Sequence, residues 1–153
     1  MGAKADQYTA QFKAANQQMM ARVESMTDGE WKTITAEEGW PAGVCAHHAA
    51  ESTGPVAGLI QMLATTGELP PFSAEALDAG NAEHAQRAAN CTKAETLELL
   101  TSSEAPTVAM LQGISDEQFE RRAVLGSVGE VSAGQLAELI LIGHLSTHRA
   151  SLK

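Results

Sequence analysis

The sequence predicts an all-α protein. Alanine is abundant and aromatic residues make up only 4% of the chain, a balance that favours close-packed helices over strands. Apolar residues recur at steps of three and four over several long stretches, which is the spacing of one helix face. With 153 residues, 44% of them hydrophobic, the chain suits one hydrophobic core, and we expect a single domain over residues 1–153.

The first half of the chain predicts two long helices. The first runs from about Lys4 to Met26, without Gly or Pro, and the polar stretch that follows it is expected to be a loop as far as Gly39. Pro41 is placed as a first-turn proline of a second helix that ends at Thr65 or Thr66. Pro55 should remove a hydrogen bond from this helix and kink or interrupt it near Glu51.

The second half predicts a short extra helical segment and two further long helices. Ser73 has the character of a helix N-cap, and the helical pattern after it continues to about Asn90. Thr92 and Glu95 form a capping box for a third long helix over Lys93–Gln112. After a turn-like link at 115–118 and an irregular connector at 125–129, a last helix runs from Ala133 to about Leu152. This last helix is the most apolar, so we expect it to be the most buried.

Four long helices with one long connection between the second and the third predict a four-helix bundle. The long connection carries the short extra helical segment and allows the third helix to run in the same direction as the second. The expected architecture is therefore a bundle with a non-sequential crossing.

The charge and the cysteines exclude several classes of partner. Lys and Arg total 10 against 19 Asp and Glu, which gives a net charge of -9 that repels nucleic acids and anionic membrane surfaces. Cys45 and Cys91 are too few for a disulfide framework and lack CxxC spacing, so a cytoplasmic location is expected. No apolar run has the length of a signal peptide or a transmembrane segment. We expect a small-molecule substrate, and the Ala- and Leu-rich helix faces are compatible with a homodimer.

The histidines are the residues most informative about function. His144 and His148 are four apart in the last helix, so both imidazoles can reach one divalent ion. Taken alone, such a pair fits solvated or packed histidines as well as it fits a metal site. Its place on the most apolar helix favours a metal, because polar rings that project into a bundle need partners.

The second helix offers a third ligand. His47 and His48 are adjacent and point about 100° apart, so at most one of them faces the pair in the last helix. One histidine from a facing helix together with the pair gives three nitrogen ligands and leaves coordination positions open, as in a reactive metal centre. The helical spacing alone leaves open whether this histidine is His47 or His48.

The chain resembles the DinB/YfiT-like superfamily of bacterial four-helix-bundle metalloproteins. The resemblance rests on Trp40 followed eight residues later by His48, on His144-x-x-x-His148, and on a helix layout that covers nearly the whole chain. It implies an up-down-down-up bundle in which His48, His144 and His148 bind one divalent metal, zinc or nickel. The chain departs from the family pattern at His47, where a small apolar residue is usual, and at Gly54-Pro55, where the helix is usually smoother.

Four further residues have functional or structural interpretations. His47 is an alternative ligand, or a hydrogen-bond donor to one. Glu51 lies almost one turn after His48 and is the candidate catalytic carboxylate, which would orient a ligand or a metal-bound water, although a solvated helix glutamate fits equally well. Cys45 could bind zinc as a thiolate, but a small buried side chain is favoured. His84 lies among polar residues and is expected at the surface.

Three neutral imidazoles on a divalent ion would lower the pKa of a bound water or thiol. Members of the resembled superfamily include thiol-dependent transferases and isomerases, such as mycothiol-dependent maleylpyruvate isomerase, and proteins that look like metal-dependent hydrolases. The leading hypothesis is therefore a metal-dependent thiol S-transferase or hydrolase, with a low-molecular-weight thiol as an additional cofactor in the first case. The alternatives are a non-catalytic metal-binding or ligand-binding stress-response module, favoured by the lack of an assured general base, and a bundle with purely structural histidines.

Overall fold

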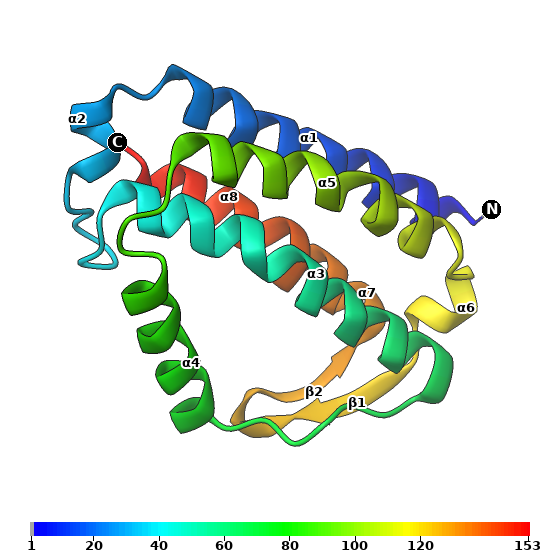
Figure 1. Ribbon diagram of the computed structural model, residues 1–153. Coiled ribbons are helices and arrows are strands. Elements are labelled where there is room, and N and C mark those ends of the chain that lie inside the picture. Colours follow the sequence, from blue (N-terminus) through cyan, green and yellow to red (C-terminus); the bar gives the residue numbers. More distant parts are fainter. Residues whose placement is uncertain (1) are drawn as a thin grey trace.

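The computed structural model describes residues 2–153 as a helical bundle (Figure 1). Its long elements are α1 (Ala3–Ser25), α3 (Ala42–Thr66), α5 (Lys93–Gln112) and a last helical stretch made of α7 (Ala133–Gln135), η2 (Leu136–Ile142) and α8 (Gly143–Ser151). Both α1 and α3 pack against α5 and α8. In Figure 1, α3 and α5 run in one direction and α1 and α8 in the other. The expected all-α, up-down-down-up bundle is confirmed.

Side-chain caps set several helix boundaries where the sequence predicts them. The Thr92 hydroxyl accepts from the Glu95 backbone N–H at 3.1 Å, and the Glu95 carboxylate accepts from the Thr92 N–H at 2.8 Å. This capping box starts α5 at Lys93, as predicted. Pro41 is the N-cap residue of α3 rather than part of its first turn.

The predicted interruption of α3 at Pro55 is wrong. The helix continues from Ala42 to Thr66 with Pro55 inside it. Thr53 and Ala57, on either side of the proline, are buried. Packing of this buried face outweighs the one backbone hydrogen bond that proline removes.

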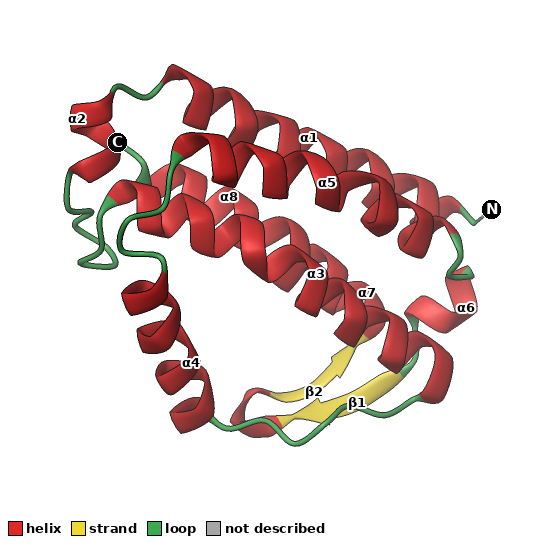
Figure 2. Ribbon diagram, viewed as in Figure 1, coloured by secondary structure: helices red, strands yellow, loops and turns green. Residues whose placement is uncertain are grey.

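Short elements occupy segments that the sequence predicts as loops. They are α2 (Asp28–Lys32), α6 (Asp116–Phe119), and an antiparallel hairpin of β1 (Arg122–Leu125) and β2 (Gly129–Ser132) joined by η1 (Gly126–Val128) (Figure 2). Gly126 and Gly129 adopt φ values of 49° and 100°, which other residues rarely adopt. The expectation of an irregular connector at 125–129 is wrong, because strands of four residues are too short to give a clear alternating pattern.

The extra segment between the second and third long helices forms α4 (Ala74–Arg87). It begins as predicted, with the Ser73 hydroxyl accepting from the Ala76 N–H at 3.1 Å. Figure 1 shows that α4 projects from the bundle and that the C-terminal end of α4 approaches α3. Of the residues in α4, only His84 is buried.

The core lies between the four long helices, and the expectation that the last helix is the most buried is wrong. Leu139 and Ile140 of η2 are 62% and 39% exposed, because a helix with apolar residues on all sides can turn only part of its surface toward a bundle core. The α3 helix contributes more buried residues. No helix within residues 2–153 combines the length and the hydropathy that crossing a membrane requires.

Gly43 and Gly58 of α3 provide a paired test of the packing. A Cβ atom at Gly43 would lie 2.3 Å from Cε2 of Trp31, whose Nε1–H donates to the Cys91 carbonyl at 3.0 Å. We expect Gly43→Ala to lower the free energy of unfolding by about 1–3 kcal/mol. Gly58→Ala meets nothing within 4 Å and should raise it by about 0.5–1 kcal/mol. Urea unfolding measures both effects, and equal changes in the two variants would contradict the close contact at Gly43.

Candidate metal centre

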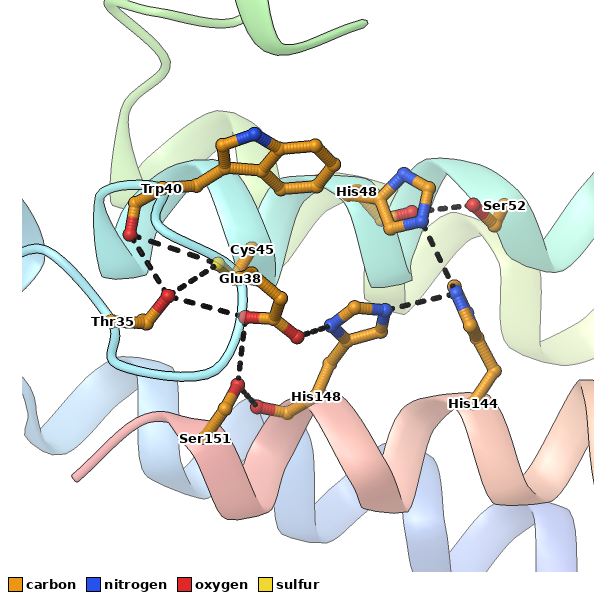
Figure 3. A network of polar contacts seen from close by, with 9 residues as sticks. All are labelled: Thr35, Glu38, Trp40, Cys45, His48, Ser52, His144, His148 and Ser151. Atoms are coloured by element: carbon orange, nitrogen blue, oxygen red, sulfur yellow. Dashed lines mark hydrogen bonds and ion pairs between the residues drawn. The ribbon is translucent and has the colours of Figure 1, made fainter. Parts of the chain in front are cut away.

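Three histidines from two helices converge at one point of the bundle (Figure 3). His144 Nε2 lies 3.2 Å from His48 Nε2 and 3.0 Å from His148 Nε2. His48 belongs to α3, and the other two belong to α8. One nitrogen of each ring lies within 4.8 Å of the others, which is close enough for all three to hold one metal ion. The structure thus brings together the three predicted ligands, which we call the triad.

The helix before the triad has unusual geometry. The segment Leu136–Ile142 is π-helical, and the Gly143 N–H donates to the carbonyl of Glu138, five residues earlier. This wider turn changes the rotation of α8 relative to α7, so it helps to set the direction in which His144 and His148 point. Such π-helical turns occur frequently at functional sites. The apolar pattern of the sequence does not distinguish this segment from an ordinary α-helix.

Glu38 is the carboxylate that contacts the triad, and sequence analysis missed it. Its Oε1 lies 2.5 Å from His148 Nδ1, and its Oε2 accepts from the Ser151 hydroxyl at 3.1 Å. Burial opposes ionisation of Glu38, but contacts with Cys45, His148 and Ser151 outweigh it and hold the pKa of this carboxyl below its usual value. An ionised Glu38 keeps a proton on His148 Nδ1, so the lone pair is on Nε2 and faces the triad.

The rings of His48 and His144 are neutral at physiological pH. Burial, followed by the neighbouring His148, lowers the pKa of His48 to about 4 and that of His144 to about 3. The three imidazoles direct their Nε2 atoms at one another, although N–H groups cannot satisfy all of these contacts at once. A divalent cation would satisfy them, and nitrogen donors of this kind are typical of zinc sites. The donor set fits a resident divalent metal.

Trp40 covers one side of His48. The ring centroids of the two residues lie 5.6 Å apart in an edge-on arrangement. The Trp40 carbonyl accepts from the Thr35 backbone N–H at 2.8 Å and from its hydroxyl at 3.0 Å, which holds the loop before α3 against the site. This arrangement accounts for the Trp40 to His48 spacing that the sequence analysis singled out.

Comparison with known proteins identifies the family. A family model described as the DinB superfamily matches residues 11–152. The chain belongs to the DinB superfamily. Among solved structures, YfiT from Bacillus subtilis, described as a probable metal-dependent hydrolase with an unusual four-helix bundle topology, matches with a TM-score of 0.76 and 19% identity, covering 97% of this chain and 83% of YfiT. No curated protein matches the chain.

A second similar structure is the mycothiol-dependent maleylpyruvate isomerase. It matches with a TM-score of 0.74 and 15% identity, and the alignment covers 97% of this chain but 60% of the isomerase. At these levels of identity, both likenesses show that this DinB-superfamily chain shares the bundle fold.

Cys45 of this DinB-superfamily chain lies next to the site but is not among the triad. Its Sγ lies 3.5 Å from the Thr35 hydroxyl and 3.9 Å from the Trp40 carbonyl oxygen. Burial and the neighbouring Glu38 raise the pKa of the thiol to about 12. A buried protonated thiol is the small side chain that the sequence analysis favoured over a thiolate ligand.

We expect Cys45 to be almost inert to thiol reagents in the folded protein. At pH 8 a thiol with a pKa of about 12 is almost entirely protonated, and only the thiolate reacts. A Cys91→Ala variant isolates the Cys45 signal. Absorbance with an aromatic disulfide reagent should show slow labelling in buffer and rapid labelling after unfolding in guanidinium. Rapid labelling of the folded variant would contradict the burial of Cys45.

Glu51 and His47 lie in a neighbouring cluster rather than in the triad. The Glu51 carboxylate accepts from the Arg87 guanidinium at 2.9 and 3.1 Å, and His47 Nδ1 lies 2.8 Å from His84 Nε2. The ion pair with Arg87 is the largest reason why the pKa of Glu51 lies below its usual value. The catalytic role of Glu51 stays a prediction.

The expectation that His84 lies at the surface is wrong. Its side chain is buried, and its ring centroid lies 5.1 Å from that of His48 and 6.4 Å from that of Trp40. Its polar neighbours on α4 face solvent, whereas His84 itself faces α3. No signal in the sequence indicates this contact, because it depends on how the long connection brings α4 back to the bundle.

Proposed function

We propose that this protein is a divalent-metal-dependent enzyme in which the triad serves to activate a low-molecular-weight thiol or a water molecule. The observation that carries the proposal is the convergence of three imidazole Nε2 atoms beside an ionised Glu38. It is supported by similarity to YfiT, described as a probable metal-dependent hydrolase, and to an isomerase described as mycothiol-dependent. The reaction class is thiol S-transfer or hydrolysis.

Different residues of the chain would bind the metal, orient a ligand and cover the site. His48, His144 and His148 would hold the ion, which is zinc or nickel in this proposal. Glu38 keeps the proton of His148 on Nδ1 and so leaves Nε2 free to bind. Trp40 packs edge-on against His48 and covers one side of its ring. A divalent ion in this site would lower the pKa of a bound thiol or water toward neutrality.

A reacting thiol would have to come from outside the chain. Burial raises the pKa of Cys45 to about 12 and that of Cys91 to about 11, so neither supplies a thiolate. The nearby carboxylates are also occupied, since Glu38 contacts His148 and Glu51 pairs with Arg87. Hydrolysis would benefit from a free general base more than transfer of a metal-activated thiol would. Thiol transfer is therefore the favoured reaction, and hydrolysis is the second.

The proposal includes a small-molecule substrate and a cytoplasmic location. Both cysteines are free thiols, as is usual in a reducing compartment. The net charge of -9 disfavours polyanionic partners, but it is compatible with a small substrate that meets a local cation.

The test uses protein without a histidine tag, loaded with zinc or nickel. A model electrophile, 1-chloro-2,4-dinitrobenzene, is offered with bacillithiol, mycothiol or glutathione, and p-nitrophenyl acetate is offered separately as a test of hydrolysis. We expect conjugation that a chelator abolishes and that the His144→Ala variant lacks. Metal binding without turnover in either assay would instead support a non-catalytic binding module.

A further inference from the structure

A second group of metal-ligating side chains lies beside the triad. It consists of His47 and Glu51 on α3 and His84 on α4. We propose that these three residues bind a second divalent metal ion, for which zinc is the probe. This second site is separate from the proposed activity, because none of its ligands belongs to the triad.

The geometry provides a donor set suited to zinc. His47 and Glu51 are four apart and lie on one face of α3. His84 Nε2 lies 2.8 Å from His47 Nδ1 and 3.3 Å from the Glu51 carboxylate. One ligand atom from each of the three residues lies within 4.8 Å of the others. Two imidazoles and one carboxylate form the protein ligands of several zinc sites that keep a fourth position open.

Hydrogen bonding alone leaves this cluster unsatisfied. His84 is buried and its Nδ1 has no hydrogen-bond partner, so the polar contacts of the ring lie on the Nε2 side. There, His47 Nδ1 and a Glu51 oxygen both lie close to one nitrogen, which can donate at most one hydrogen. A cation between the three atoms would satisfy all of them. His47 and Glu51 are only partly buried, which leaves a route for the ion to enter.

Arg87 distinguishes the two sites. It donates two hydrogen bonds to Glu51, and a carboxylate has about four lone-pair positions, so Glu51 can keep Arg87 and still offer one oxygen to a metal. The guanidinium charge nevertheless repels a cation held at Glu51. The ring of His84 also lies against that of His48, so an ion in the triad would repel the second one. We therefore expect the second site to be the weaker of the two.

The experiment is a zinc titration of tag-free protein from which metal has been removed with a chelator. Calorimetry, with elemental analysis of the desalted protein, should show two equivalents of zinc with different affinities. The Glu51→Gln and His84→Ala variants should each lose only the weaker equivalent. His144→Ala should lose only the tighter one. Arg87→Gln should retain both and strengthen the weaker site by about three- to tenfold, because it removes a competing positive charge.

Two controls separate loss of a ligand from loss of structure. Glu75→Gln removes the same charge as Glu51→Gln from an exposed position of α4 and should leave both equivalents. Circular dichroism checks that α4 stays helical in His84→Ala, and Glu51→Gln nearly preserves the shape of the side chain. The inference would be overturned if no zinc equivalent of the wild-type protein depended on both Glu51 and His84. The proposed function fails on different results, namely no equivalent that depends on His144 or no turnover by the metal-loaded protein, and neither result removes the second equivalent.

Discussion

We expect the His144→Ala protein to fold but to lose tight binding of divalent metal. His144 Nε2 contacts the Nε2 atoms of both other triad rings, at 3.2 and 3.0 Å, so its removal leaves two ligands with no third between them. Loss of a direct ligand should lower zinc affinity by more than the roughly 10- to 100-fold loss expected when only a hydrogen-bond partner of a ligand is removed. Competition with a chromophoric chelator measures the affinity.

Thr147→Ala is the matched control for this variant. Thr147 is an exposed residue of α8 between the two triad histidines, so its truncation perturbs the same helix without touching the site. Its metal affinity should equal that of the wild-type protein. Unchanged tight binding in His144→Ala would show that the metal is bound elsewhere.

Glu38→Gln is expected to weaken metal binding while the triad itself remains. The substitution removes the negative charge 2.5 Å from His148 Nδ1. That charge fixes the tautomer of His148 and makes its Nε2 a stronger metal ligand. Zinc affinity should fall by roughly 10- to 100-fold. Glu37→Gln is the control, because Glu37 is the adjacent carboxylate and pairs with Lys153 at 2.8 Å, away from the triad. Equal affinities in the two variants would contradict the role of Glu38.

The stability difference between the metal-free wild-type protein and the metal-free Glu38→Gln variant should depend on pH. The folded-state pKa of Glu38 lies below its usual value, so its carboxylate stabilises the fold at pH values above the unfolded pKa. This contribution is lost as the pH falls through the lowered folded value. The difference in urea stability between wild-type and variant should therefore be largest near neutral pH and shrink below about pH 4. A difference that grows in acid would contradict this assignment.

The sequence predicts most of the bundle because its signals are local. The capping boxes at Thr92 and Ser132 place helix starts within a few residues, and the apolar periodicity of Tyr8, Phe12 and Met19 identifies a buried face. The same local rules apply to Thr27, whose capping box with Glu30 starts α2. That signal is present in the sequence, but Asp28 and Gly29 beside it favour a turn equally well.

The parts that were missed depend on contacts between distant segments. Glu38 reaches His148 across 110 positions of sequence, and His84 meets His47 only because α4 returns to α3. Neither residue lies in a spacing pattern with its partner. The triad was predictable because two of its members share a helix face and the family resemblance supplied the third. In the neighbouring cluster His47 and Glu51 also share a helix face, but no pattern in the sequence links them to His84.

The most direct test of the metal centre is a crystal structure of the tag-free, zinc-loaded protein with anomalous data at the zinc absorption edge. The account predicts an anomalous peak between the Nε2 atoms of His48, His144 and His148, with zinc–nitrogen distances of about 2.0–2.1 Å. Tightly bound zinc at another position, or protein that holds no zinc after loading, would contradict it.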